Sequence, residues 1–496
     1  MKKSLKIFAL ILALLMVVPV MVACGNKGGE GNQGGTTADP STVDTSDGEY
    51  ASKLPAYDWD EDIFYILGRE DTNGGQGHNF EIWRENMPGD VVGDAVYTRN
   101  ENLRKKYNFI VEAGLVTNTY TEAQTLYDAQ DDVYDLVIYQ PSKVFNHASS
   151  GYLLDLYSID YLDFDHPTWS ADVNTELTVG GKLFASTNQF LLQDKKRTYI
   201  MFYNREMSRQ NGFGNLEDHV DNNTWTLEKM EEVTRALSFD IDGGGGGHYG
   251  DNFGLATEGP SSFWAMISGA GFTLGQNDGE TITLTGATNE MNSIIDAAGK
   301  IWFDKNVTTM PEDFSPLDYY SSIKIFCEGR SLFMLSFPSD FDQTVTGGLN
   351  DSCKFEFGVM PFPKYDSEQE RYYNAMNVQN ASIFAIPYTV ADPAQVGFYL
   401  EAISEESVDT SYPAFIESKC MIQDSYDELT ARMLSLSFDS MTYDVVTLLN
   451  PGGIFGIVSD QVPTFRTNIF IRLYNSKGDK PQIALDEYVA NFEELE

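Results

Sequence analysis

The chain has 496 residues, of which 42% are hydrophobic and 13% aromatic. This is enough apolar material for more than one hydrophobic core, so a disordered chain and a mini-protein are both excluded. Asp and Glu total 74 against 33 Lys and Arg, and the resulting charge of −41 would repel nucleic-acid phosphates and anionic lipid. We therefore expect no nucleic-acid partner, and any membrane attachment must be covalent or hydrophobic.

The first residues predict export and a lipid anchor. A cluster of lysines precedes an apolar run over 7–23, which is the pattern of an export signal. The run is short for a spanning helix, which needs about 20 residues. Met21–Gly25 resembles a bacterial lipobox, in which the thiol of Cys24 is acylated and the chain is cut just before it. We expect a lipoprotein signal peptide over 1–23 and a protein anchored to the outer face of the cytoplasmic membrane; an ordinary signal peptide with an incidental cysteine is the alternative.

A flexible tether is expected over 24–49, because this stretch is rich in Gly, Asn, Thr and Ser and almost free of apolar residues. The remaining cysteines, Cys327, Cys353 and Cys420, are odd in number and have no CxxC spacing. We interpret them as buried free thiols, with one oxidised pair as the alternative.

Hydrophobic patterns predict alternating strands and amphipathic helices in the first part of the chain. In chain order these strands and helices are 63–67, 94–107, 109–111, 122–129 and 135–139. The β-α-β-α-β order indicates parallel strands joined by right-handed crossovers. Open sheets of this kind bind ligands at the carboxyl ends of their strands, so the loops that begin at Gly68 and Gln140 are candidate walls of a cleft.

The rest of the chain continues the alternation. Thr226 can cap a helix whose first turns carry three glutamates, which suit the positive end of the helix dipole. Further core strands are expected over 331–337, 355–360 and 382–387, and further helices over 394–406, 424–436 and 481–494. The sequence therefore predicts two α/β lobes.

Several segments, in a fixed order, carry a resemblance to a known family. They are Tyr134–Val137 with Gly151–Leu156, Gly181–Ala185, Phe202–Met207, Asn223–Met230, Phe326–Met334 and Phe357–Tyr365. Together they resemble the extracellular solute-binding proteins of ABC importers (family 1), the group that includes the maltodextrin-binding protein. The resemblance implies a periplasmic-binding-protein-like α/β fold of two lobes, each a mostly parallel sheet flanked by helices, with the ligand cleft between the lobes.

The resemblance also implies how the chain is divided and what it does. Lobe 1 is expected over 50–192 and 378–436, and lobe 2 over 193–377 and 437–496. We expect a monomer without catalysis and without a cofactor, which captures a solute and delivers it to ABC transporter permease subunits. The expected solute is a mono- or oligosaccharide.

Sequence motifs for catalysis were sought because an enzyme is the main alternative. The sequence has no Gly-x-Ser-x-Gly elbow, no His-Glu-x-x-His zinc helix and no phosphate-binding loop, and its histidines are far apart. Carboxylates are abundant enough to hide a glycosidase-like pair, so a tethered surface hydrolase acting on saccharides is one alternative. A surface binding module without a transport role is another.

One acidic loop partly resembles a calcium site. Asp240, Asp242 and Asp251 take the first, third and twelfth positions of a calcium loop, and glycines follow the second of them. The fifth position is Gly244 and the twelfth is not the bidentate Glu. We favour an acidic surface loop over a weak calcium site.

Sugar-binding clefts need flat aromatic faces and planar polar groups that form paired hydrogen bonds. The strand-end rule and the resemblance together give eleven candidates for ligand binding. They are Arg69, Gln140, Arg197, Tyr199, Trp264, Ser339, Asp340, Phe341, Asn377, Phe465 and Arg466. The loop over 337–341 lacks the tryptophan that maltodextrin binders carry there, which argues against a strict maltodextrin specificity.

Overall fold

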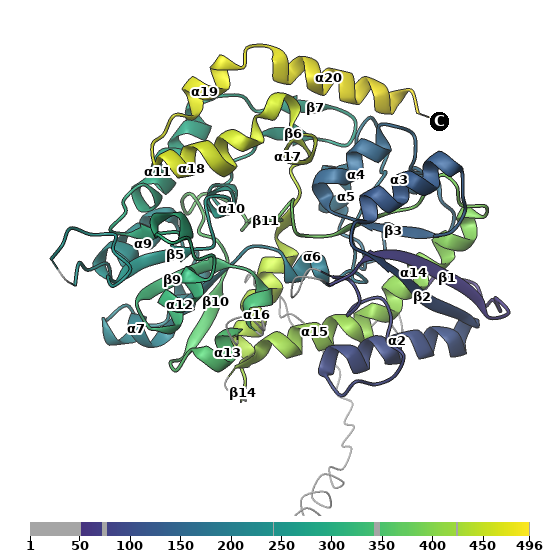
Figure 1. Ribbon diagram of the computed structural model, residues 1–496, viewed down its shortest axis with the longest axis horizontal. Helices are drawn as coiled ribbons and strands as arrows, with labels where there is room; N and C mark the ends of the chain where they lie inside the picture. Colours follow the sequence, from purple (N-terminus) through teal and green to yellow (C-terminus); the bar gives the residue numbers. More distant parts are fainter. Residues whose placement is uncertain (1–50, 72–76, 242, 342–347, 423–424, 496) are drawn as a thin grey trace, which may run out of the picture. The chain divides into compact units, whose positions relative to one another are not determined.

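The computed structural model describes residues 51–71, 77–241, 243–341, 348–422 and 425–495, all within one compact unit (Figure 1). The expected signal peptide, Cys24 and the tether lie outside the described residues, as does Asp242. Within the described ranges no helix is both long and apolar enough to cross a membrane.

The first lobe is built on a four-stranded sheet in the order β12-β3-β1-β2. β1 (Asp62–Arg69) pairs in parallel with β2 (Phe109–Val116) and β3 (Leu136–Tyr139), and β12 (Ile383–Ala385) runs antiparallel to β3. The three parallel strands confirm the predicted β-α-β-α-β order. Their carboxyl ends, at Arg69, Val116 and Tyr139, lie on one edge of the sheet.

Helices cover both faces of this sheet because each has one apolar side. α2 (Val91–Tyr107) buries Val96, Leu103 and Tyr107, and the carboxylate of Asp90 caps it by accepting from the Gly93 N–H at 2.7 Å. The other helices of the first part of this lobe are α3 (Thr119–Ala129), α4 (Pro141–Ala148) and α5 (Ala171–Leu177), and α6 (Gln193–Lys196) follows on the way to the second lobe. The predicted helices over 94–107 and 122–129 are confirmed, each with an earlier start.

The second lobe contains a five-stranded sheet in the order β10-β4-β9-β5-β8. These strands are β4 (Ile200–Asn204), β5 (Phe253–Thr257), β8 (Thr308–Thr309), β9 (Ser331–Ser336) and β10 (Phe357–Met360). All of their residues are buried, as expected for strands covered on both faces. β4 runs antiparallel to its neighbours β9 and β10, so its first residue lies at the edge where β5 and β9 end.

Seven helices of the described chain belong to the segment that forms this lobe. They are α7 (Arg205–Gln210), α8 (Glu217–Asp221), α9 (Leu227–Ala236), α10 (Ser262–Gly269), α11 (Asn289–Trp302), α12 (Ser321–Cys327) and α13 (Gly348–Ser352). α9 begins where predicted, because the Thr226 hydroxyl accepts from the Lys229 N–H at 3.3 Å. Burial of Leu227, Met230 and Val233 gives this helix its apolar face.

Three chain segments lie side by side between the two sheets, and we call them the central segments. The first is 193–199, which leads into β4; the second is 374–382, which leads into β12; the third is 440–444. β11 (Asn374–Ala375) pairs in parallel with β15 (Met441–Thr442), and Thr198 pairs with Met376. The central segments therefore join the two lobes.

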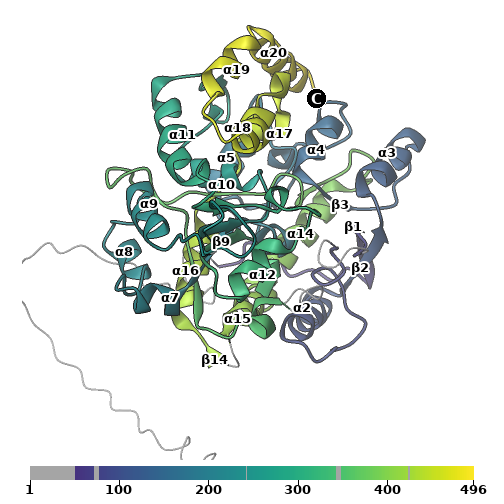
Figure 2. The same ribbon diagram turned by 60° about the vertical axis from the view of Figure 1, so that its left-hand side comes forward.

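The helices that follow β12 divide between the lobes. α14 (Pro393–Asp409) and α15 (Ser411–Cys420) both contact α2, and Figures 1 and 2 show α15 beside α2. α16 (Glu428–Asp439) instead contacts β10 of the second sheet. The return to lobe 1 expected over 378–436 therefore includes one helix that packs on the second lobe.

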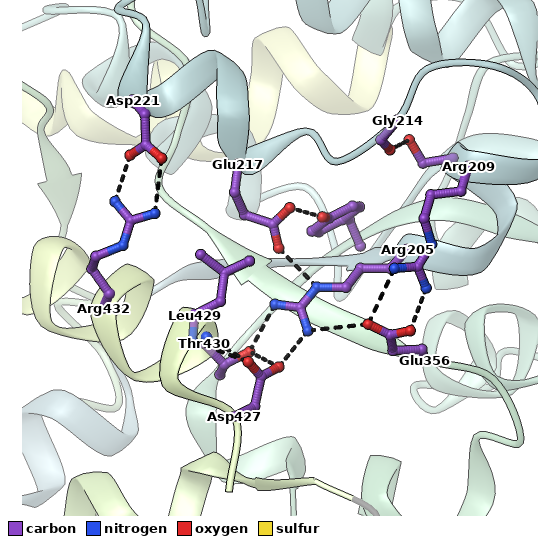
Figure 3. Close-up of polar contacts among 12 residues, drawn as sticks. Arg205, Arg209, Gly214, Glu217, Asp221, Glu356, Asp427, Leu429, Thr430 and Arg432 are labelled. Atoms are coloured by element: carbon purple, nitrogen blue, oxygen red, sulfur yellow. Dashed lines mark hydrogen bonds and ion pairs between the residues drawn. The ribbon is translucent and has the colours of Figure 1, made fainter.

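A buried arginine holds α16 in this place (Figure 3). Arg205, at the end of β4, pairs with Glu217 on α8 at 2.8 Å and with Asp427, the residue that caps α16. Burial raises the pKa of Glu217 to about 8, and its second oxygen accepts from the Tyr203 hydroxyl. The pKa of Asp427 is lowered because the bond and charge of Arg205 outweigh the effect of burial.

The C-terminal part contributes short helices and contacts both lobes. Its elements are α17 (Val445–Leu449), α18 (Val462–Phe465), α19 (Phe470–Ser476) and α20 (Lys480–Glu493), with the hairpin β6 (Gly275–Asn277) and β7 (Ile282–Leu284) beside α17 and α20. α17 contacts α4 of the first lobe and α18 lies near α10 of the second. The helix predicted over 481–494 is confirmed as α20.

The cysteine interpretation is wrong for two of the three residues. Cys327 and Cys353 form a disulfide, with Cα atoms 4.3 Å apart, while Cys420 is free and buried. Cys327 is the last residue of α12 and Cys353 directly follows α13. Their meeting depends on how these two helices pack, which cysteine spacing does not reveal. A disulfide agrees with the expected export from the reducing cytoplasm.

Candidate functional site

A cavity of about 360 Å³ lies where the edge of the second sheet meets the second central segment and the C-terminal part. Tyr199, Glu258, Ser261 and Trp264 line it from the second lobe, 376–380 from the second central segment, and Asn450, Phe455, Gly456 and Ser459 from the C-terminal part. This set contains two aromatic rings besides Tyr199 and several carboxamides. Its position agrees with the rule that open α/β sheets bind ligands at their strand ends.

Tyr199 lies at the centre of the polar wall of the cavity. It directly precedes β4, and the antiparallel direction of that strand brings it to the carboxyl edge of β5 and β9. Its hydroxyl donates to the Glu258 carboxylate at 3.3 Å and accepts from the Asn377 Nδ2 group at 3.3 Å. Its ring lies on Phe337, with 4.8 Å between ring centroids. Tyr199 therefore connects the second sheet to the second central segment.

Glu258 supplies the carboxylate of the cavity and follows the last residue of β5. It accepts from the Ser261 hydroxyl at 3.1 Å as well as from Tyr199. Burial raises the pKa of Glu258, and the nearby charge of Asp340 raises it further. The hydrogen bonds from Ser261 and Tyr199 act to lower this pKa, but their effect is smaller. The group is a strong hydrogen-bond acceptor that a ligand hydroxyl can reach from the cavity.

Two aromatic side chains form the apolar wall. Trp264 on α10 is buried and meets Phe455 edge to face, with 5.4 Å between ring centroids. Phe455 is half-buried and lies a few residues after the Asn-Pro-Gly-Gly turn that begins at Asn450. The family resemblance instead implied Phe465 as the aromatic contact of this region. The Asn-Pro-Gly-Gly turn is the sequence feature that could have pointed to Phe455, because it marks where a new helix starts beside the cavity.

The carboxamides come from two segments far apart in the sequence. Asn377 Oδ1 accepts from the backbone N–H groups of Gln379 and Asn380 at 3.0 and 3.2 Å, which fixes this turn of the second central segment. Asn377, Gln379 and Asn380 line the cavity, and Asn450 adds a fourth carboxamide from the C-terminal part. Gln140, at the end of β3, donates to the Gln379 carbonyl at 3.0 Å. The first sheet thus supports the cavity lining through Gln140 without itself lining it.

Two candidate arginines come from different segments, Arg69 from the end of β1 and Arg197 from the first central segment. Arg197 packs over the Phe337 ring, with its guanidinium 5.7 Å from the ring centroid. Burial lowers the pKa of Arg197, although the nearby charges of Asp340 and Glu258 act to raise it. Arg69, at the end of β1, has its pKa lowered by burial and by the charge of Arg197.

No protein family model matches the chain, and no curated protein matches it. Its fold, however, matches many solved structures. A cyclo/maltodextrin-binding protein complexed with maltotetraose aligns with a TM-score of 0.51 and 13% identity over 88% of this chain and 97% of that chain. UgpB from Mycobacterium tuberculosis, in complex with glycerophosphocholine, aligns with a TM-score of 0.52 and 15% identity over 80% and 95%.

A third match comes from an ABC transporter of Bifidobacterium longum. Its galacto-N-biose/lacto-N-biose I-binding protein, in complex with lacto-N-biose, aligns with a TM-score of 0.52 and 10% identity over 87% of this chain and 98% of that chain. The chain has the two-lobe fold of the ABC solute-binding proteins. The fold expected from the sequence is thereby confirmed.

Not all the candidate residues of this solute-binding fold reach the cavity. Tyr199, Trp264 and Asn377 line it, and Gln140 contacts the lining residue Gln379, whereas Arg69, Arg197 and Asp340 are not in the lining. Ser339 donates to the Asp340 carboxylate at 3.5 Å, so it supports that side chain.

Three further candidates, Phe341, Phe465 and Arg466, also lie outside the cavity lining. Phe341 is fully buried against Phe202, with 5.0 Å between ring centroids, and so belongs to the core of the second lobe. Phe465 is 66% exposed. The Arg466 guanidinium donates to the carbonyl groups of Trp302 and Thr308 at 2.8 and 3.0 Å and pairs with Asp313, so its role is structural.

The acidic loop uses its carboxylates on its own backbone. Asp240 accepts from the N–H groups of Gly243 and Gly245 at 2.7 and 3.1 Å, and Asp251 accepts from those of Ile241 and His248 at 3.1 and 2.9 Å. In the part of the chain that the structure describes, no three potential metal-ligating side chains gather. These bonds explain why a glycine-rich loop carries the two acids.

Proposed function

We propose that the protein captures a mono- or oligosaccharide in this cavity and delivers it to the permease of an ABC importer. It does so without catalysis or a cofactor, as a monomer held on the outer face of the cytoplasmic membrane by lipid on Cys24. The observation that carries the proposal is the cavity beside the second central segment, whose lining contains both aromatic side chains and carboxamides. The saccharides in two of the three structures described above support the same class of solute.

The chemistry of the lining suits a neutral, hydroxyl-rich solute. Each sugar hydroxyl donates and accepts, and carboxamides such as those of Asn380 and Asn450 offer both functions on one planar group. Trp264 and Phe455 offer aromatic faces and edges to the C–H side of a sugar ring. Among the described residues that line the cavity there is no lysine or arginine, so a phosphate or carboxylate group meets no full positive charge there.

Binding couples to the arrangement of the lobes through the central segments. A solute in the cavity contacts the second lobe, the second central segment and the C-terminal part at once. Closing the lobes on the solute adds contacts from the first lobe, so the solute stabilises the closed form. The permease then recognises that form.

Thermal unfolding of the compact unit Thr45–Glu496 with a panel of saccharides, amino acids and peptides tests the proposal. A ligand present at a hundred times its Kd stabilises the native state by about 2.7 kcal/mol, which raises the melting temperature. We expect a shift with one class of saccharide and no new product by chromatography. A panel in which only amino acids or peptides shift the melt would contradict the saccharide assignment, and product formation would favour the tethered hydrolase.

A further inference from the structure

The segment His78–Ile82, which we call the clasp, joins the cleft end of β1 to two of the three central segments. It follows β1 in the chain and forms a tight turn, in which the N–H groups of Glu81 and Ile82 donate to the His78 carbonyl at 3.1 and 3.2 Å. His78 and Glu81 are both buried, and each makes its side-chain bonds to a different part of the molecule.

His78 connects β1 with the second central segment. Its backbone N–H donates to the Arg69 carbonyl at 2.8 Å, and its Nδ1 accepts from the Arg69 N–H at 2.8 Å. Because Nδ1 accepts, the ring proton lies on Nε2, which then donates to the Ser382 hydroxyl at 2.7 Å. Burial lowers the pKa of His78 to about 3, which agrees with a neutral ring. Ser382 is the residue just before β12.

Glu81 connects the same turn with the first central segment. Its Oε2 accepts from the backbone N–H groups of Leu192 and Gln193 at 2.6 and 2.8 Å, at the start of α6. α6 contacts the 338–341 segment of the second lobe and leads into β4. Glu81 is fully buried, so removing its carboxyl group takes away the acceptor by which the first lobe holds these two N–H groups.

The clasp is also fixed to the first lobe by a buried side chain from outside it, that of Arg99. Arg99 on α2 donates from Nη2 to the carbonyl groups of Glu81 and Ile82, both at 2.9 Å. Arg99 has no exposed surface. The clasp therefore moves with α2 and β1, while its two side chains hold segments that lead to the second lobe and to β12.

We propose that Glu81, held in place by the bonds of His78 to Arg69 and Ser382, is the positioning residue that sets the angle between the two lobes and transmits occupation of the cleft from the end of β1 to the central segments. The part of the proposal in which a bound saccharide acts through the clasp rests on the proposed function. The part in which the clasp sets the angle between the lobes does not. Without the Glu81 carboxyl group, α6 is no longer held to the first lobe at this point. The lobes then sample a wider range of angles.

The chain offers a matched control for a purely structural role. Glu401 on α14 is also buried, and its Oε2 accepts from the Trp169 Nε1 group at 2.9 Å and from the Asp163 N–H at 3.3 Å. Burial raises the pKa of Glu81 and of Glu401 to about 8. The two carboxyl groups differ in their partners, because those of Glu401 all lie in the first lobe.

The test measures the distance between spin labels on exposed positions of the two lobes, Lys105 on α2 and Glu290 on α11, by pulsed electron paramagnetic resonance on the ligand-free protein. Glu81→Ala and His78→Ala are expected to shift or broaden the distance distribution. Glu401→Ala is expected to lower stability without changing that distribution, and Glu81→Gln, which keeps the acceptor oxygen, is expected to restore the wild-type distribution. Identical distributions for Glu81→Ala and Glu401→Ala would overturn the proposal.

A binding measurement then separates this proposal from the proposed function. With the saccharide that shifts the wild-type melt most, Glu81→Ala is expected to raise Kd at least about fivefold, and Glu401→Ala to leave it unchanged. A chain that binds no saccharide in the panel refutes the proposed function but leaves the ligand-free distance result standing. A changed distribution with unchanged Kd refutes the transmission from the cleft to the central segments.

Discussion

Replacing Phe455 with alanine is expected to weaken saccharide binding about 30-fold, the equivalent of about 2 kcal/mol. Phe455 lines the cavity, meets Trp264 edge to face and keeps part of its ring exposed to the cavity space. The variant removes the aromatic surface on which the C–H face of a sugar packs. Calorimetric titration with the saccharide identified by thermal unfolding measures the effect.

Phe465→Ala is the matched control for this prediction. The side chain is 66% exposed and does not line the cavity, so the same chemical change is expected to alter Kd less than twofold. Both variants are expected to keep a cooperative unfolding transition near that of the wild type, because neither ring is fully buried. Equal affinities of the two variants would mean that the ligand does not use the aromatic wall.

Replacing Arg205 with methionine is expected to lower the free energy of unfolding by about 3–5 kcal/mol. The guanidinium is buried between Glu217 and Asp427, and the variant removes a hydrogen-bond donor from the buried Glu217 carboxyl group and the positive partner of Asp427 (Figure 3). The cost arises because Glu217 stays buried at 1% side-chain exposure after its partner is lost. Chemical denaturation followed by circular dichroism measures the loss.

Arg432→Met provides the comparison, since Arg432 also links α16 to the second lobe. Its pair with Asp221 has a contact of 2.9 Å, but the two side chains are 40% and 45% exposed. Water screens such a pair, so the expected loss is below about 1 kcal/mol. Losses of similar size for the two variants would show that burial does not decide the strength of these contacts.

Much of the fold could be predicted from the sequence because local patterns determine it. The continuous apolar run of β1, the apolar face of α2 and the Thr226 cap of α9 each depend on neighbouring residues, and each prediction is confirmed. Tyr199 was selected from the family resemblance and not from a local pattern. It directly precedes β4, at the edge of the second sheet.

The remaining errors concern contacts between segments that are distant in the sequence. Cys327 meets Cys353 only because α12 packs beside α13. Phe455 reaches the cavity because the C-terminal part folds back over α10, whereas Phe465, ten positions later, remains exposed. Glu258 carried no signal beyond its place after a strand, since its hydrogen bonds come from Tyr199 and Ser261 after folding.

Filling the cavity tests the central claim most directly. Gly456 lines the cavity, its φ is −59°, and a Cβ atom placed on it meets no heavy atom within 4 Å, so Gly456→Trp puts a large side chain there without backbone strain. Gly250→Trp is the control, because Gly250 has the same free space but lies outside the lining. In calorimetric titrations we expect one saccharide per wild-type chain, the same for Gly250→Trp and no binding for Gly456→Trp. Unchanged affinity of a folded Gly456→Trp variant would contradict the assignment of this cavity as the solute site.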